Sequence, residues 1–177
     1  IEEILMLQRS GLILLLAASL AIAGEASVSV KVDLADVVEQ GVVSPVGGIT
    51  SAGQPDKAAL SVFAETGYVA VIDMRTAGEE RGLDEPAAVE GLGMQYVPFP
   101  ISSSDINLEM AGELDALLEQ FDGPVLLHCG SGNRVGALLA LREFLDSGDA
   151  EQALQTGRDG GLTRLESTVK EVIDAAE

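Results

Sequence analysis

The residues best suited to chemistry lie together in the run His128-Cys-Gly-Ser-Gly-Asn-Arg134, which contains the chain's only histidine and only cysteine. Gly130 and Gly132 permit the tight backbone angles with which successive N–H groups point inward and form a nest for an anion. Arg134 offers a planar fork that suits two oxygens of a tetrahedral anion. The same groups would stabilise the thiolate of Cys129, so the run predicts a nucleophilic cysteine facing a bound anion.

Two interpretations of this run are possible. In the first interpretation the run is an ordinary turn between a strand and a helix, and the cysteine is a small buried hydrophobic residue. The context favours an active loop, because an apolar strand ends at His128 and a helix begins near Val135, adding the positive end of its dipole. We expect Cys129 and Arg134 to be catalytic, and the substrate to be bound by His128, Gly130, Ser131, Gly132 and Asn133.

Strands and helices alternate along the chain, and this alternation predicts how the loop is positioned. Continuous apolar runs with β-branched residues indicate strands buried on both faces, as in a parallel sheet, and apolar stripes indicate covering helices. We expect extended segments at 42–46, 48–52, 68–74, 94–99 and 124–128, and helices at 33–40, 56–66, 85–92, 107–120, 135–145, 150–157 and 163–175. The pattern predicts a single α/β domain with a central, mostly parallel sheet flanked by helices.

Charged residues outside the active run are expected to support structure. Thr163 and Glu166 have the spacing of a capping box for the last helix. Asp73 and Arg75 end a strand, where they would pair with each other beside the active loop. Residues 79–81, Glu-Glu-Arg, have the composition of a solvated loop.

Residues 1–26 have the pattern of an export signal. A short basic segment at 6–9 precedes an apolar stretch at 11–23 that ends in small residues. Residues 1–5 precede the first plausible start and are not expected to be native coding sequence. The alternative is a retained anchor, although a membrane span needs about 20 apolar residues. We expect a periplasmic or secreted bacterial protein without stable membrane anchoring, with residues 27–177 as its single domain.

The formal net charge of −19 bears on the partners of the protein. So acidic a chain is unsuited to nucleic acid or anionic lipid, and an anionic substrate would need a strong local cradle. One cysteine and one histidine cannot make a structural zinc site, so we expect neither a metal nor another cofactor. A small tetrahedral anion or a phosphoester is the expected ligand. The sequence does not predict an oligomeric state.

Three segments resemble a known bacterial family, the beta-lactamase-hydrolase-like protein phosphatase-like proteins, a distant branch of the tyrosine and dual-specificity phosphatases. They are Ile49-Thr-Ser-Ala-Gly-Gln-Pro55, Gly67-Tyr-Val-Ala-Val-Ile-Asp-Met-Arg75 and Val125-Leu-Leu-His-Cys-Gly-Ser-Gly-Asn-Arg-Val-Gly-Ala137, and residues 157–166 resemble the closing segment of the family. The resemblance implies a tyrosine-phosphatase-like fold and hydrolysis of a phosphomonoester. It also implies that Cys129 forms a thiophosphoryl intermediate and that an aspartate protonates the leaving oxygen, with Asp105 as the candidate acid.

The active run departs from the usual phosphatase pattern at two places. Four residues, 130–133, separate cysteine from arginine where that pattern has five, and Val135 replaces the usual serine or threonine. Four is the loop length of rhodaneses, which carry sulfur as a cysteine persulfide. Three hypotheses therefore stay open: a secreted phosphatase-like hydrolase, a sulfurtransferase, and a non-catalytic anion-binding module.

Overall fold

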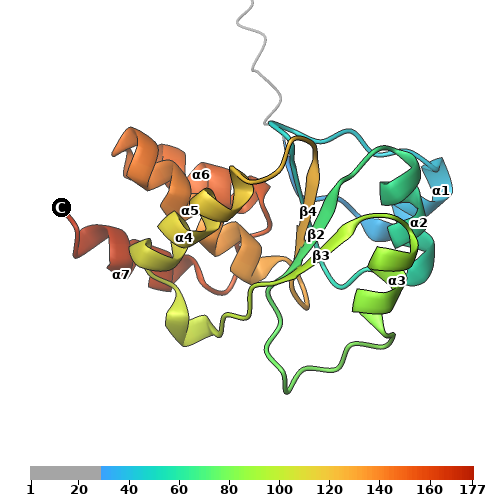
Figure 1. The fold of residues 1–177 in the computed structure, drawn as a ribbon. Helices are drawn as coiled ribbons and strands as arrows, with labels where there is room; N and C mark the ends of the chain where they lie inside the picture. Colours follow the sequence, from blue (N-terminus) through green and yellow to red (C-terminus); the bar gives the residue numbers. More distant parts are fainter. Residues whose placement is uncertain (1–28) are drawn as a thin grey trace, which may run out of the picture.

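The computed structural model describes residues 29–177, which form one α/β unit with a sheet between two layers of helices (Figure 1). The predicted export signal at residues 1–26 lies outside the described residues. The sheet has four strands in the order β1-β4-β2-β3, and every neighbouring pair is parallel. The predicted fold class is therefore confirmed.

The carboxyl ends of the four strands lie side by side at the same level of the sheet. They are β1 (Ile49–Ala52), β2 (Ala70–Asp73), β3 (Gln95–Pro98) and β4 (Val125–His128). The last residue of β4, His128, pairs in register with Ala52 of β1 and Asp73 of β2. Ligands bind outside the carboxyl ends of parallel strands. This register therefore places the start of the predicted active loop in the middle of the row of strand ends, between those of β1 and β2.

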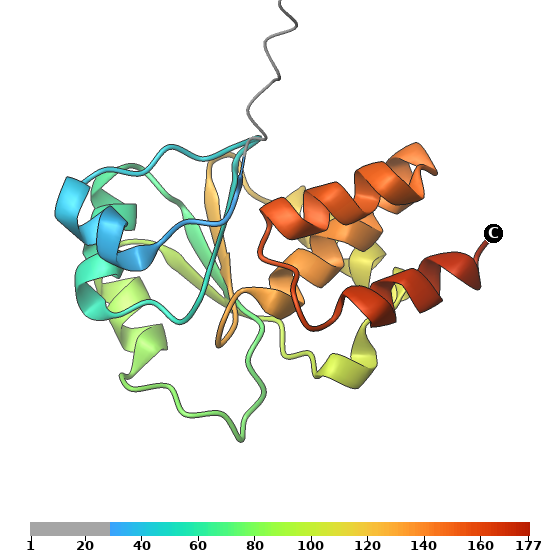
Figure 2. The same ribbon diagram turned by 180° about the vertical axis from the view of Figure 1, so that it is seen from behind.

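Helices cover both faces of the sheet, as Figures 1 and 2 show from opposite sides. One face carries α1 (Leu34–Gln40), α2 (Lys57–Glu65) and α3 (Glu85–Gly91). The other carries α4 (Leu108–Leu118), α5 (Asn133–Ser147), α6 (Ala150–Asp159) and α7 (Glu166–Asp174), with a short 3₁₀ helix, η1 (Ser103–Asp105), before α4. The longest of these, α5, has 15 residues, and no helix within residues 29–177 has the length and apolarity needed to cross a bilayer.

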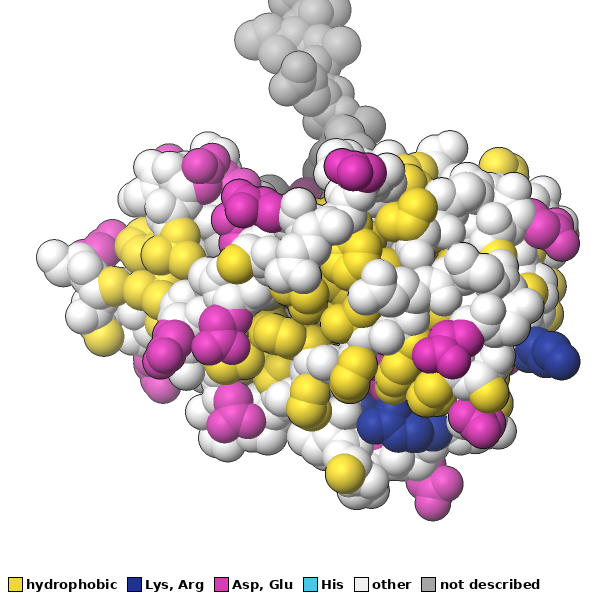
Figure 3. All heavy atoms as spheres, in the orientation of Figure 1, with side chains coloured by type: hydrophobic (Ala, Val, Ile, Leu, Met, Phe, Trp, Pro, Cys, Tyr) yellow, Lys and Arg dark blue, Asp and Glu magenta, His cyan; other side chains and the backbone are white. Residues whose placement is uncertain are grey.

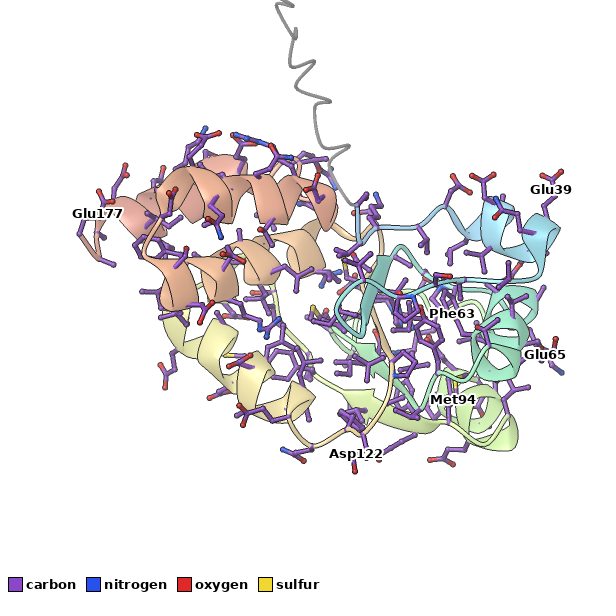
Figure 4. The ribbon with its side chains drawn as sticks, turned by 90° about the horizontal axis from the view of Figure 1, so that it is seen from above. Glu39, Phe63, Glu65, Met94, Asp122 and Glu177 are labelled. Atoms are coloured by element: carbon purple, nitrogen blue, oxygen red, sulfur yellow. The ribbon has the colours of Figure 1, made fainter. Side chains whose placement is uncertain are left out.

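The two faces of the sheet bury separate cores. Side chains alternate across a strand, so Val71 and Leu126 face the α1–α3 layer while Ile72 and Leu127 face the α4–α7 layer. In Figure 4 Phe63 and Met94 lie inside the first core, whereas the labelled acidic residues lie at the rim. Burying aliphatic side chains of this size stabilises the fold by roughly 1.5–3 kcal/mol each. These cores hold the strands whose ends carry the site.

Helix ends test the sequence-based capping predictions. The Asn107 side chain caps α4 by accepting the Met110 N–H at 2.9 Å, as its position before the helix predicted. The predicted capping box of the last helix is wrong: α7 begins at Glu166 without a side-chain cap. The Thr163 hydroxyl instead donates to Asn133, and the Glu166 carboxylate pairs with Arg158. Tertiary partners thus replaced the local ones.

The surface reflects the acidic composition. On the face drawn in Figure 3, acidic side chains are scattered widely, while basic ones gather at few places. Within residues 29–177, every arginine except Arg164 forms a salt bridge with a carboxylate, which matters for the site.

Candidate active site

Cys129 lies directly beyond the carboxyl end of β4, at the start of the loop that leads into α5. Its side chain is buried, and the Gly132 N–H donates a hydrogen bond to its Sγ at 3.2 Å. Gly132 has a φ of +83°, in the left-handed region that favours glycine, and it is the N-cap of α5. The thiol therefore faces a backbone N–H and the positive end of the central helix, as the sequence predicted.

Arg134, in the first turn of α5, presents its guanidinium group across the loop. Its Nη1 and Nη2 donate to the two carboxylate oxygens of Glu79 at 2.7 and 2.5 Å. Nη1 also donates to the carbonyls of Ile101 at 3.0 Å and Met74 at 3.3 Å. The end of the guanidinium is thus fixed, whereas Nε on its side edge donates no hydrogen bond to a carbonyl or carboxylate within residues 29–177, and the guanidinium also interacts with the Cys129 thiol. That edge has the bidentate geometry required for an oxyanion.

Glu79 corrects one sequence-based expectation, because it belongs to the site and not to a solvated loop. Its hydrogen bonds from Arg134 lower the pKa of the Glu79 carboxyl to about 2. The same pair raises the pKa of Arg134, and the nearby charge of Cys129 adds to that rise. Both groups therefore stay charged at any ordinary pH, and the pair orients the guanidinium permanently.

A cavity of about 450 Å³ opens over the active loop. We call it the loop cavity; it is lined by Thr76, Glu79, Ser102, Ser103, Gly130, Ser131, Asn133, Arg134 and Arg164. A hollow of about 520 Å³ lies elsewhere, between the β1 edge and α5. None of the residues predicted for the site lines that hollow, whereas Gly130, Ser131, Asn133 and Arg134 line the loop cavity. Cys129, which directly precedes Gly130, is buried beneath the loop and is not among the lining residues.

The other side of the loop is closed by a network of polar and charged side chains, which we call the rear cluster: Asp73, Arg75, Glu85 and His128, which are buried, with Arg81 and Tyr96, which are partly exposed. Arg75 donates to Asp73 from Nε at 2.9 Å and from Nη2 at 3.0 Å, and it also pairs with Glu85. Arg81 pairs with Asp73 as well, and the Tyr96 hydroxyl donates to Asp73 at 2.7 Å. The predicted Asp73–Arg75 pair thus exists, within a larger network, and Arg81 belongs to this network instead of a solvated loop.

Burial and pairing act in opposite directions on Asp73. Burial acts to raise the pKa of this carboxyl, but the hydrogen bonds from Arg75 and the other partners prevail and hold it below its ordinary value. For Tyr96, burial and the adjacent Asp73 carboxylate raise the pKa to about 12. Asp73 is therefore a fixed anion and Tyr96 a fixed hydroxyl donor.

His128 is the rear-cluster residue nearest the nucleophile, since it directly precedes Cys129. Its side chain is fully buried, with Nε2 2.8 Å from Glu85 and 3.7 Å from Asp73, although the first contact lacks the alignment of a hydrogen bond. His128, Glu85 and Asp73 offer ligand atoms within 4.8 Å of one another, a spacing that could hold a metal ion. Arg75 already donates to both carboxylates, however, so a cation would have to displace a guanidinium. The donor set fits an ion-pair network better than a metal centre.

Asp105, the predicted general acid, lies at the end of η1 with its side chain turned back on its own loop. Its carboxylate accepts the Ser102 N–H at 2.8 Å in a capping box. These hydrogen bonds from Ser102 lower the pKa of Asp105, which favours the form without a proton to donate. Ser102 and Ser103 line the loop cavity, but Asp105 does not. A role as acid would therefore require the cap to open.

The predicted substrate-binding residues of the loop divide by where they point. Gly130 and Ser131 line the loop cavity, and the Gly130 carbonyl accepts the Gln54 N–H at 3.4 Å, which ties the loop to the Gly-Gln-Pro turn after β1. The Asn133 side chain points into the fold, where its Oδ1 accepts the Thr163 N–H at 2.8 Å and the Thr163 hydroxyl at 3.0 Å. Asn133 thus holds a distant segment against the loop.

Sequence reasoning missed the cavity residues that come from distant segments. Glu79, Ser102, Ser103 and Arg164 reach the loop only through the fold. The only sequence signal for Arg164 was its position directly after Thr163, within the segment that resembles the closing part of the family. For Glu79, the signal was an acidic residue shortly after a strand that ends beside the active loop.

Comparison with protein families gives a match over more than half of the chain. The family described as "Beta-lactamase hydrolase-like protein, phosphatase-like domain" matches residues 43–145. A beta-lactamase hydrolase-like protein of Agrobacterium fabrum is 32% identical over 102 residues, covering 55% of this chain and 24% of the relative. Its counterpart in Xylella fastidiosa is 35% identical over 98 residues, covering 53% and 23%. The chain thus spans about a quarter of the length of the curated relatives it matches.

Solved structures resemble the chain in fold. A candidate phosphatase from Neisseria meningitidis superposes with a TM-score of 0.63 at 22% identity, over 73% of this chain and 93% of that one. Tk-PTP in its active form gives 0.54 at 21% identity, over 71% and 91%. TpbA of P. aeruginosa in complex with phosphotyrosine gives 0.51 at 18% identity, over 72% and 84%. At these identities the likeness establishes a tyrosine-phosphatase-like fold.

Proposed function

The chain belongs to the family of beta-lactamase hydrolase-like protein phosphatase-like domains, and from that premise we propose that it is a cysteine-dependent phosphatase that hydrolyses phosphomonoesters. The observation that carries the proposal is the placement of Cys129. Its Sγ accepts the Gly132 N–H at the start of α5, close to the guanidinium group of Arg134, which Glu79 holds in a fixed orientation. The loop that borders the cavity thus carries a nucleophile, a backbone N–H directed at it and a guanidinium fork.

The proposed reaction has two steps. The Cys129 thiolate attacks phosphorus, an S–P bond forms, and the bond from phosphorus to the leaving oxygen breaks. Water then attacks the thiophosphoryl cysteine and releases inorganic phosphate and the thiolate. In both steps the Arg134 side edge and the loop N–H groups hold the phosphoryl oxygens, where charge is greatest in the transition state. His128 and the rear cluster keep the loop in place.

The leaving oxygen is the weak point of this mechanism. The loop cavity has one carboxylate, Glu79, which is held ionised by Arg134, and Asp105 caps η1 without lining the cavity. Neither group is arranged to give up a proton. We therefore expect hydrolysis to depend strongly on the leaving group, with aryl phosphates accepted and alkyl phosphates nearly inert.

The same observations favour one second candidate, sulfur transfer through a Cys129 persulfide. The loop has four residues between cysteine and arginine, the rhodanese length. In this reaction the Cys129 thiolate attacks the outer sulfur of thiosulfate, a persulfide S–S bond forms, the S–S bond of thiosulfate breaks and sulfite leaves, so no acid is needed for an alkoxide. The two candidates differ in the atom that reaches the thiolate.

Trapping at the single cysteine distinguishes the two chemistries. The protein would be quenched in acid after mixing with 4-nitrophenyl phosphate and, separately, with thiosulfate, and its intact mass measured. TpbA, a structural neighbour, is seen with phosphotyrosine, which makes an aryl phosphate a suitable probe. We expect a phosphoryl adduct that is absent from Cys129→Ser. A sulfur adduct alone would replace the proposal with the second candidate, and turnover by Cys129→Ser would refute both.

We also propose that residues 1–26 direct export. Expression in a bacterial host should yield a periplasmic protein whose N-terminus follows one of the small residues near Ala23. A cytoplasmic product that retains the leader would contradict this proposal.

A further inference from the structure

Arg164 brings a second guanidinium to the loop cavity from a distant part of the chain. It lies in the connection between α6 and α7 and lines the cavity together with Arg134 and Ser131. Figure 2 shows this connection passing beside the start of α5, at the end of the molecule where the loop after β4 also lies. Two arginines from separate elements therefore border one cavity.

The charge of Arg164 is not used within the described fold. The other arginines of residues 29–177 all pair with carboxylates: Arg75 and Arg81 with Asp73, Arg134 with Glu79, Arg142 with Asp115, and Arg158 with Glu166. Arg164 has no such partner in this part of the chain, although the protein has 29 acidic residues and only 10 lysines and arginines. An unpaired arginine beside an anion-binding loop is available to a ligand.

The backbone around Arg164 is fixed to the active loop itself. The Asn133 Oδ1 accepts the N–H of Thr163 at 2.8 Å and that of Leu165 at 3.4 Å, so one loop side chain holds both neighbours of Arg164. Asn133 is itself buried, the hydrogen bond to Leu165 is buried as well, and the one to Thr163 is partly buried. Arg164 is therefore held in register with the loop that contains Cys129.

A glycine contact supports the same placement. A Cβ on Gly136 of α5 would lie 2.1 Å from the Leu162 nitrogen and 2.6 Å from the Gly157 carbonyl oxygen. Only glycine lets the backbone of the 157–162 segment lie directly on α5. The backbone segment that leads to Arg164 is therefore held against the first turns of α5, the helix that also carries Arg134.

We infer that Arg164 forms a second anion subsite, and that the substrate carries a second anionic group, a phosphate or a carboxylate, besides the phosphoryl group at Cys129. The inference rests on the proposed function, because it assumes that the active loop binds the first anion. A guanidinium beside the cavity would contact the remote anion through a charge-assisted hydrogen bond. Arg164 is then a specificity-determining residue of the phosphatase, and substrates with one anionic group are poor ones.

Calorimetry on Cys129→Ser tests the inference by binding, without any need for turnover. The probes are propyl phosphate, a series of α,ω-alkanediol bisphosphates of increasing length, and an alkyl phosphate that ends in a carboxylate. The best bisphosphate should bind roughly 10-fold more tightly than propyl phosphate, or about 1.4 kcal/mol. This exceeds the roughly twofold statistical advantage of a ligand with two identical ends. The carboxylate probe shows whether the remote group must be a phosphate.

Two variants in the same background locate the effect. Arg164→Gln should abolish the advantage of the bisphosphate and leave the affinity for propyl phosphate within about twofold. Arg142→Gln removes the same charge from the pair with Asp115, outside the loop cavity, and should keep the advantage. Equal affinity for one and two anions, or an advantage that survives Arg164→Gln, overturns the inference alone. Failure of every probe to bind overturns the proposed function with it.

Discussion

The two sides of the active loop hold their charges in opposite ways. In the rear cluster the side chains of Asp73, Arg75, Glu85 and His128 are fully buried and contact one another. At the loop cavity, the side chains of Arg134 and Glu79 are 13% and 32% exposed, and Arg164 is exposed without an acidic partner among residues 29–177. The rear cluster is internally balanced, with two carboxylates against two guanidinium groups, of which only that of Arg81 is partly exposed. At the loop cavity two guanidinium groups accompany one carboxylate, so a positive charge there is available to an anionic ligand.

This difference indicates which side positions the loop and which side selects the ligand. A buried ion pair contributes little net stability over an apolar equivalent, but it is strongly destabilising when one partner is removed. The rear cluster therefore holds His128, and with it the start of the loop, in one arrangement. At the loop cavity, water screens the charges, and a bound anion can replace this water. Substitutions there should therefore alter ligand binding more than folding stability.

The largest effect should come from breaking the rear cluster. Asp73→Asn keeps the size of the side chain but leaves Arg75 and Arg81 with one carboxylate fewer in a buried site. We expect the free energy of unfolding to fall by about 3–5 kcal/mol, measured by urea denaturation. Asp115→Asn removes the half-exposed partner of Arg142 and should cost no more than about 1 kcal/mol. Equal losses in the two variants would remove the distinction between buried and exposed pairs.

An intermediate effect is expected where the Arg164 segment packs on α5. Gly136→Ala would force its new methyl group against backbone atoms that cannot rotate away, so overpacking should cost about 1–3 kcal/mol. Gly112→Ala in α4 is the matched control, because a Cβ there meets nothing within 4 Å. Removing a helical glycine should stabilise that variant by roughly 0.5–1 kcal/mol. Thermal or urea unfolding should therefore give opposite signs; stabilisation by both substitutions would show that the α5 contact can open freely.

Most of the fold could be predicted from the sequence because its signals are local. The apolar runs 68–74 and 124–128 predicted β2 and β4, and their two-sided burial predicted a parallel sheet. The position of Asn107 directly before an apolar stripe predicted the N-cap of α4. The capping box of the last helix failed because Thr163 and Glu166 found partners in Asn133 and Arg158 that are close only after folding.

The site divides in the same way. The chemistry of Cys129 and Arg134 was predicted because the nest, the helix start and the fork lie in one continuous run. Glu79 and Arg164 could not be placed, since nothing in a single sequence shows which charged residue of a distant loop comes back to the site. Asp105 remains a prediction whose observed cap opposes the assigned role. The catalytic roles themselves await the trapping experiment.

The smallest effect should come from the pair of Glu79 and Arg134 at the loop cavity, and its pH dependence gives it a distinctive signature. Glu79 has a pKa of about 2, below the ordinary 4.5, because Arg134 donates to its carboxylate. A lowered pKa contributes stability that is complete above about pH 4.5 and is lost as the pH falls towards 2. Since Glu79 is partly exposed, Glu79→Gln should cost at most about 1 kcal/mol at pH 6, and the difference should shrink as the pH falls through 4 and 3. Glu39→Gln, at the exposed end of α1, controls for removing one negative charge from so acidic a protein. Urea unfolding at several pH values measures both variants; a loss of several kcal/mol for Glu79→Gln, or one that does not diminish in acid, would place the pair with the buried rear cluster.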